Sequence, residues 1–369
     1  MRRRNSVALL FFFLLAAQFL ANSQTAGSAA QPPERAPSAQ APASPQPPSA
    51  QAAPNGNAQQ VGTAPDARIT TGPASGGAQN PDSSESSVFV FRKQVEEVVL
   101  HATVIDNKQH IVTNLDKNAF SIFEDGHPQT ITSFQHEDIP VAMCIVIDNS
   151  GSMREKREKV NAAALNLVRS SNPNDEVCVV NFNDEYYLDQ DFTSNIKKLK
   201  EGLEKIESRG GTALYDAVVA SATHLKENAK REKKVIFVVT DGDDNESSET
   251  LEQAVQRLQV ENGPTVYAIG ILEGEDHARH AKRALQVMCE RTGGMAFLPK
   301  TLDEVDAIST TIARDIRTQY TIGYKPTTPK TQGGYREVKV EAKSPDHAKL
   351  TVRTKSGYYA GAAPPAGGQ

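Results

Sequence analysis

Five oxygen-bearing side chains stand where a protein could hold a divalent metal ion. Each of them follows an apolar run or a glycine pair closely, and the set consists of Asp148, Ser150, Ser152, Thr212 and Asp241. Carboxylate and hydroxyl oxygens are hard ligands that suit Mg²⁺ or, as alternatives, Mn²⁺ and Ca²⁺. The residue types therefore predict a metal site built from oxygen atoms.

The segments before these residues indicate how the side chains come together. Residues 141–147 and 235–239 are apolar runs without a polar break, a pattern typical of strands buried on both faces of a parallel sheet. The polar residues that follow would lie in loops at the carboxyl ends of strands, where open α/β sheets bind ligands. Between the two runs, Gly210 and Gly211 precede Thr212 and a helical pattern.

Three motifs in this order resemble the von Willebrand factor A domain with its metal-ion-dependent adhesion site: D-N-S-G-S, G-G-T and V-V-T-D-G. The family's D-x-S-x-S falls on Asp148, Ser150 and Ser152. Its threonine falls on Thr212 and its distal aspartate on Asp241. The resemblance implies that the three hydroxyls bind the metal directly, whereas the two carboxylates act largely through water.

A metal held mainly by hydroxyl groups keeps much of its positive charge and attracts another anionic oxygen. The Asp or Glu side chain of a protein partner would supply it, so we expect a metal-dependent binding module of the adhesion type. The alternative is an exported enzyme, a hydrolase or a thiol redox protein, that uses the fold as a scaffold. No nucleophile–base pair or G-x-S-x-G motif accompanies the site, which favours binding. A purely structural interpretation is that the Asp and Ser residues cap helices and turns.

The first 86 residues differ in composition from the rest. Residues 1–23 contain three arginines, an apolar run and the small residues Ala21 and Ser23, which together predict a cleaved signal peptide. An uncleaved anchor is the alternative. Residues 24–86 are rich in Ala, Pro, Gln, Ser and Gly and predict a disordered linker. We therefore expect a secreted or periplasmic protein with no membrane span in the mature chain.

The charge of the chain argues against nucleic acid as a partner. The formal net charge is −5, and removal of the signal peptide with its three arginines leaves −8. No block of basic residues is present that could neutralise phosphates.

Three cysteines, Cys144, Cys178 and Cys289, lie far apart within apolar patterns. The family fold would make the strands of Cys144 and Cys178 neighbours, so a disulfide between them is conceivable. An odd number of cysteines permits at most one such bond. We expect buried free thiols instead.

Strands alternate with helices from residue 139 to residue 318, which predicts a doubly wound, mostly parallel α/β sheet for the A domain. β-rich segments at 87–138 and 319–360 flank it, followed by a flexible tail at 361–369. The ends of a compact domain are commonly close together. We therefore expect the two flanks to form one small β-sandwich, with two separate hairpins as the alternative.

The first flank carries its own hairpin signal. Asp125 and Gly126 predict a tight turn, with residues 130–134 as the return strand, and a further strand is expected at 88–91. The sequence motif E-D-G-x-P-Q-x-I-T-S-F resembles the bacterial "VWFA-related" family of exported proteins.

Two other groups of side chains are weaker candidates for metal binding. His277 and His280 stand three residues apart on a predicted helix, where a solvated helix face is the favoured interpretation. Asp243 and Asp244 follow Asp241 and could hold a second cation, although an exposed acidic loop is favoured there.

Overall fold

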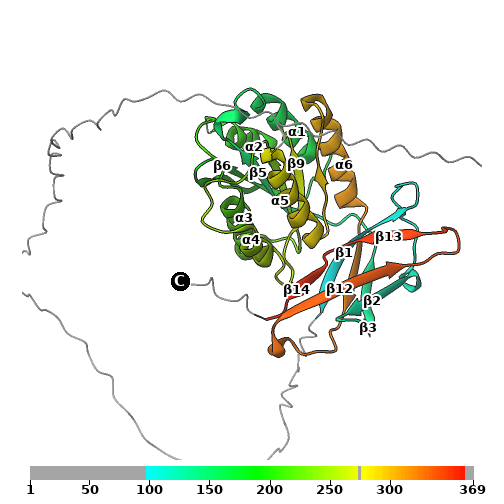
Figure 1. Cartoon of the computed structure of the whole chain (residues 1–369). Helices are drawn as coiled ribbons and strands as arrows, with labels where there is room; N and C mark the ends of the chain where they lie inside the picture. Colours follow the sequence, from blue (N-terminus) through cyan, green and yellow to red (C-terminus); the bar gives the residue numbers. More distant parts are fainter. Residues whose placement is uncertain (1–96, 206, 273–275, 362–369) are drawn as a thin grey trace, which may run out of the picture. The chain divides into compact units, whose positions relative to one another are not determined.

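The computed structural model describes residues 97–205, 207–272 and 276–361, all of which belong to one compact unit (Figure 1). The predicted signal peptide, the linker, the strand at 88–91 and the tail after residue 361 lie outside these residues. None of the helices within them combines the length and the apolarity that a membrane span needs.

The centre of the α/β part is a six-stranded sheet with the strand order β10-β9-β8-β5-β6-β7. Its strands are β5 (Val141–Asp148), β6 (Glu176–Phe182), β7 (Tyr186–Thr193), β8 (Lys233–Thr240), β9 (Thr265–Gly270) and β10 (Ala296–Phe297). Neighbouring strands run parallel except β7, which pairs antiparallel with β6 at the edge. The predicted doubly wound, mostly parallel sheet is confirmed.

Helices cover both faces of this sheet (Figure 1). They are α1 (Arg157–Arg169), α2 (Ile196–Leu203), α3 (Leu214–Asn228), α4 (Leu251–Leu258), α5 (Asp276–Thr292) and α6 (Val305–Arg317). The odd-numbered residues of β5 pack with α1, α2 and α6 in one core, and the even-numbered residues pack with α3, α4 and α5 in another. Two cores on opposite faces explain why all eight residues of β5 are buried.

Short 3₁₀ turns also occur in the described part of the chain. These turns are η1 (Lys117–Ala119), η2 (Gly151–Met153), η3 (Leu302–Glu304) and η4 (Lys330–Gln332). Three further turn residues separate η2 from Arg157, where α1 begins. Helix α4 begins with a complete capping box between Thr250 and Gln253, in which each side chain accepts a hydrogen bond from the other residue's backbone N–H.

Both flanks contribute to each of two four-stranded sheets, β13-β1-β11-β4 and β14-β12-β2-β3. From the first flank come β1 (Val98–Asp106), β2 (Phe120–Glu124), β3 (His127–Gln129) and β4 (Ile131–Gln135), and from the second β11 (Tyr320–Tyr324), β12 (Tyr335–Ala342), β13 (Leu350–Arg353) and β14 (Gly357–Tyr359). One apolar core contains residues from both sheets. The flanks therefore build a single sandwich rather than two hairpins. The residues at which the predicted domains begin and end stay predictions.

The prediction that residues 130–134 form the return strand of the hairpin is wrong, because this strand pairs elsewhere. After the Asp125-Gly126 turn, in which both residues have positive φ, the chain returns as β3 against β2. It then leaves that sheet at Thr130, and β4 pairs with β11 in the other sheet. Strand β14 was not predicted, because three residues are too short for a periodic pattern.

The expectation of free thiols at Cys144 and Cys178 is also wrong. The two residues lie directly opposite each other on the parallel strands β5 and β6, with a Cα–Cα distance of 4.7 Å, and form a disulfide bond. Cys289 remains a free, buried thiol.

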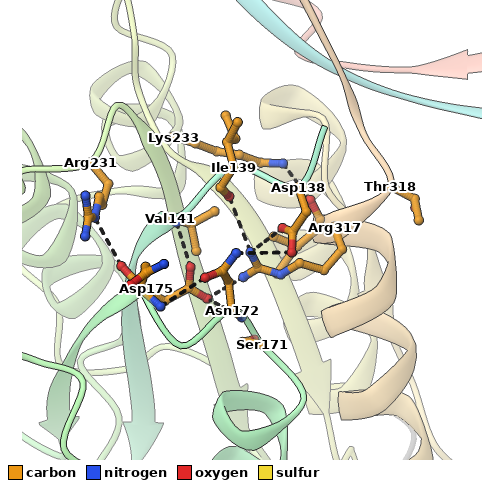
Figure 2. A network of polar contacts seen from close by, with 12 residues as sticks. Asp138, Ile139, Val141, Ser171, Asn172, Asp175, Arg231, Lys233, Arg317 and Thr318 are labelled. Carbon is orange, nitrogen blue, oxygen red and sulfur yellow. Dashed lines mark hydrogen bonds and ion pairs between the residues drawn. The ribbon is translucent and has the colours of Figure 1, made fainter. Parts of the chain in front are cut away.

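A polar network fixes the place where the chain enters and leaves the α/β part (Figure 2). Arg317, the last residue of α6, donates to Asp138 at 2.7 Å and also to Asp175. Asp175 in turn accepts from the backbone N–H of Val141 at 2.8 Å. Entry before β5 and exit after α6 are thus held together, which allows both flanks to meet in one sandwich.

A second buried carboxylate joins the two parts of the molecule. Asp315 on α6 accepts hydrogen bonds from Thr103 of β1 at 3.1 Å, from Tyr267 of β9 at 2.6 Å and from Arg353 of β13 at 2.5 Å. The sandwich and the α/β sheet therefore share one buried acceptor.

Replacement of Asp315 by Ala should lower the free energy of unfolding by about 3 kcal/mol, because it leaves the Arg353 guanidinium, whose side chain is 18% exposed, without its counter-charge and leaves Thr103 and Tyr267 without their acceptor. Chemical denaturation would measure the loss. The matched control is Asp303→Ala, which removes the partner of an exposed ion pair with Lys159 and should change stability little. Equal effects of the two substitutions would contradict a shared buried acceptor.

The buried Lys233 should make stability depend on pH. Its Nζ donates to the carbonyl of Ile316 at 2.6 Å, and burial, assisted by Arg317, lowers its pKa to about 7. Between pH 7 and the ordinary lysine range the unfolded chain holds this proton and the folded chain does not, so folding gains stability as pH rises. The unfolding free energy of wild type relative to Lys233→Met should therefore increase from pH 7 to pH 10. The exposed Lys226→Met provides the control, and a pH-independent gap for Lys233→Met would overturn the prediction.

Candidate metal centre

The innermost group of the centre is Asp148, the last residue of β5, which is fully buried. Its Oδ1 accepts from the backbone N–H of Ser150 at 2.7 Å, and its Oδ2 accepts from the hydroxyl of Thr240 at 2.6 Å. Thr240 is the last residue of the neighbouring strand β8. Burial raises the pKa of Asp148 to about 6, against the opposing effect of these hydrogen bonds. The ends of two parallel strands therefore orient one carboxylate.

The turn after β5 carries the two serines. Ser150 precedes η2, and the backbone N–H of Gly151 donates to the carbonyl of Gly210 at 3.2 Å, which ties this turn to the loop before α3. The hydroxyls of Ser150 and Ser152 lie 3.1 Å apart. Ser150 is buried whereas Ser152 is exposed, so the centre opens to solvent on the Ser152 side.

Asp241 continues the same chain of hydrogen bonds. Its Oδ1 accepts from the Ser152 hydroxyl at 2.8 Å, and its Oδ2 lies 2.7 Å from the Nζ of Lys156. The side chain of Asp241 is fully buried although its loop is not. Two carboxylates and two serine hydroxyls therefore meet at the carboxyl edge of β5 and β8.

Thr212 lies beside this group in the loop before α3. Its backbone N–H donates to the side chain of Asn245 at 2.8 Å. A Cβ atom at Gly242 would come within 3.3 Å of the Thr212 hydroxyl oxygen, so the hydroxyl lies against the turn that follows Asp241. In the part of the chain that the structure describes, no hydrogen bond joins this hydroxyl to the other four side chains.

The structure thus links four of the five predicted residues through hydrogen bonds and places the fifth against the same turn. No cluster of three or more His, Cys, Asp or Glu side chains with the arrangement of a metal site occurs among the described residues. The predicted set contains two carboxylates only and takes its other oxygens from hydroxyls. Metal binding by this set stays a prediction.

Two members of the centre were missed by the sequence analysis. Thr240 stands in the quoted motif V-V-T-D-G, and its place as the last residue of a buried strand could have indicated a role beside Asp148. Lys156 carries no such signal. It lies four residues after Ser152, just before α1, and only the fold brings its long side chain to Asp241.

Of the weaker candidates, Asp243, Asp244 and His280 have other partners in the described part of the chain. Asp244 accepts from the backbone N–H of Tyr215 in the first turn of α3 at 3.0 Å and from the hydroxyl of Ser247 at 2.6 Å, which ties its own loop to the start of that helix. Asp243 lies 3.7 Å from the exposed His280. The side chain of His277 is outside the described part of the chain.

Comparison with protein families matches residues 143–243 to the von Willebrand factor type A domain. This part of the chain is a von Willebrand factor type A domain. The match contains the three motifs that hold the five residues of the centre. No curated protein matches the chain significantly.

Three solved structures are similar to parts of this chain. The PilB minor pilin from Streptococcus sanguinis has 13% identity and a TM-score of 0.42, over 50% of this chain and 62% of the pilin chain. The von Willebrand factor domain of the type V pili tip protein Mfa5 from Porphyromonas gingivalis has 14% identity and a TM-score of 0.41, over 48% of this chain and 95% of that chain.

A von Willebrand factor type A protein from Catenulispora acidiphila covers more of the sequence, with 14% identity and a TM-score of 0.40 over 73% of this chain and 75% of that chain. The match to the PilB minor pilin spans 62% of the pilin chain, less than two thirds of its length. With TM-scores of at most 0.42, these likenesses carry no functional argument.

Proposed function

We propose that the protein is an exported, metal-dependent binding module that captures an acidic side chain of a protein partner. Asp148, Ser150, Ser152, Thr212 and Asp241 would hold a divalent cation, Mg²⁺ or in its place Mn²⁺ or Ca²⁺. The observation that carries the proposal is the continuous set of contacts from Ser150 through Ser152 to Asp241, beside the buried Asp148. A von Willebrand factor type A domain commonly mediates contact between proteins, which agrees with this role.

The donor set agrees with a hard cation. All the side-chain atoms that could bind a metal are oxygens, and Mg²⁺, Mn²⁺ and Ca²⁺ prefer carboxylate and hydroxyl oxygens. Asp241 already has the ammonium group of Lys156 at 2.7 Å, so its carboxylate pairs with a cation even in the metal-free protein. A bound divalent cation would supply the positive charge that attracts the partner's carboxylate.

Each residue would then have a separate task. Thr240 and the Ser150 backbone hold the Asp148 carboxylate, which brings negative charge beneath the site. Ser152 is exposed and stands at the opening towards the partner. Thr212 reaches the site from the loop before α3, next to Gly242. Binding of this kind requires no general base and no nucleophile.

The alternative of a thiol redox enzyme loses support from the cysteines. Cys144 and Cys178 are joined in a disulfide between two central strands and are fully buried. Burial raises the pKa of the Cys289 thiol, which keeps it in the unreactive protonated form. A hydrolase remains the other alternative, and no described feature of the centre favours it.

The charged residues should matter most for metal affinity. Replacement of Asp241 by Ala should weaken Mn²⁺ binding by about 100-fold, because it removes a full negative charge next to the cation. Thr212→Ala should weaken it by about tenfold, because a water molecule can replace a hydroxyl oxygen. Calorimetric titration with Mn²⁺ would measure both constants, and circular dichroism would verify that the variants are folded.

Asp243→Asn is the matched control, because Asp243 lies in the same loop as Asp241 and its carboxylate faces His280, 3.7 Å away. Its Mn²⁺ affinity should equal that of wild type. Envelope proteins captured in Mg²⁺ should be lost both in EDTA and with Asp241→Ala. Undiminished Mn²⁺ binding by Asp241→Ala would contradict the assignment of the site.

A further inference from the structure

The centre contains a cation that belongs to the protein itself. The Nζ of Lys156 lies 2.7 Å from the Oδ2 of Asp241, while the other oxygen of the same carboxylate accepts from Ser152. Only 14% of the Lys156 side chain and none of the Asp241 side chain is exposed. This contact is therefore shielded from solvent, unlike an ordinary surface ion pair.

The backbone of Lys156 is hydrogen-bonded to the turn that contains Ser150 and Ser152. Its N–H donates to the carbonyl of Met153 at 2.9 Å, and its carbonyl accepts from Val160 in the first turn of α1 at 3.1 Å. The ammonium group is thus tethered to the same short segment as Ser150 and Ser152. A tether of this length holds the ammonium close to the carboxylate at all times, which raises its effective concentration there.

The next basic residue is engaged elsewhere. Arg157 donates to the backbone carbonyls of Asp148 at 3.2 Å and of Leu203, not to either carboxylate. Among the described residues, the ion pair of Asp241 is the one with Lys156, which offsets its buried charge. A buried carboxylate without such a counter-charge is costly, so the pair stabilises the metal-free centre.

We propose that Lys156 is a tethered competitor of the divalent cation at Asp241. This inference rests on the proposed function, because it takes the five residues as the metal site. The ammonium group neutralises Asp241 when no metal is bound and moves away when the metal binds, since two cations next to one carboxylate repel each other.

Competition has two consequences for the function. Metal affinity is lower than the oxygen set alone would give, so the site fills only where divalent cations are abundant. The displaced ammonium stays near the opening at Ser152, where it adds positive charge that favours an acidic partner. Lys156 would thereby couple loading of the metal to recognition of the carboxylate.

The test compares wild type with Lys156→Met, which keeps the apolar stem and removes the charge. Mn²⁺ should bind the variant about tenfold more tightly in a calorimetric titration, which corresponds to the removal of one competing ion pair. In EDTA the variant should unfold at a lower temperature than wild type, and addition of Mg²⁺ should raise its melting temperature by more than that of wild type.

Lys159→Met is the matched control, because Lys159 lies three residues further on, in the first turn of α1, and pairs with the exposed Asp303. It should match wild type in Mn²⁺ affinity. If Lys156→Met folds poorly, Lys156→Gln keeps a polar end without the charge and should show the same gain in affinity.

The outcomes separate this inference from the proposed function. Equal Mn²⁺ affinities of wild type and both Lys156 variants would overturn the competitor and leave the metal site standing. Weaker binding by the variants would also overturn it, because Lys156 would then support the metal. If neither wild type nor the variants bind Mn²⁺ or Mg²⁺ at millimolar concentration, the metal site itself is wrong and the competitor falls with it.

Discussion

A carboxylate buried at the end of a buried strand is the constraint on which the site depends. Strand β5 packs against helices on both faces, so Asp148 at its carboxyl end reaches no open solvent and must find its partners within the protein. Thr240 and the backbone of Ser150 supply them. Because these partners come from the end of β8 and from the turn after β5, they draw both segments to one point. Burial of an acid thus organises the whole centre.

Contacts elsewhere in the molecule hold the strand that carries Asp148 in place. The disulfide between Cys144 and Cys178 joins β5 to β6 within the sheet. Asp175 and Arg317 hold the amino end of β5 next to the end of α6. Asp315, also on α6, binds groups from both the α/β sheet and the sandwich. The sandwich formed by the two flanks is therefore attached through a helix that packs directly on the central sheet.

Much of the fold and most of the centre could be predicted from local pattern. Unbroken apolar runs before Asp148 and Asp241 indicate buried parallel strands. The polar residues at their carboxyl ends must then lie together at one edge of the sheet. The disulfide could not be settled in this way, because it depends on the register that sets Cys144 opposite Cys178. The switch of the chain between sheets at Thr130 likewise depends on a distant partner, because β4 pairs with β11 from the second flank. Lys156 reaches Asp241 through a long side chain whose direction no periodicity encodes.

The proposed function requires that the five oxygen-bearing residues hold a divalent cation. Anomalous diffraction from a crystal of the protein soaked in Mn²⁺ tests it most directly. We expect a single strong peak roughly 2.0–2.6 Å from the hydroxyl oxygens of Ser150, Ser152 and Thr212, with the Lys156 ammonium displaced from Asp241. A peak elsewhere on the surface, or no peak and an unchanged contact between Lys156 and Asp241, would contradict it.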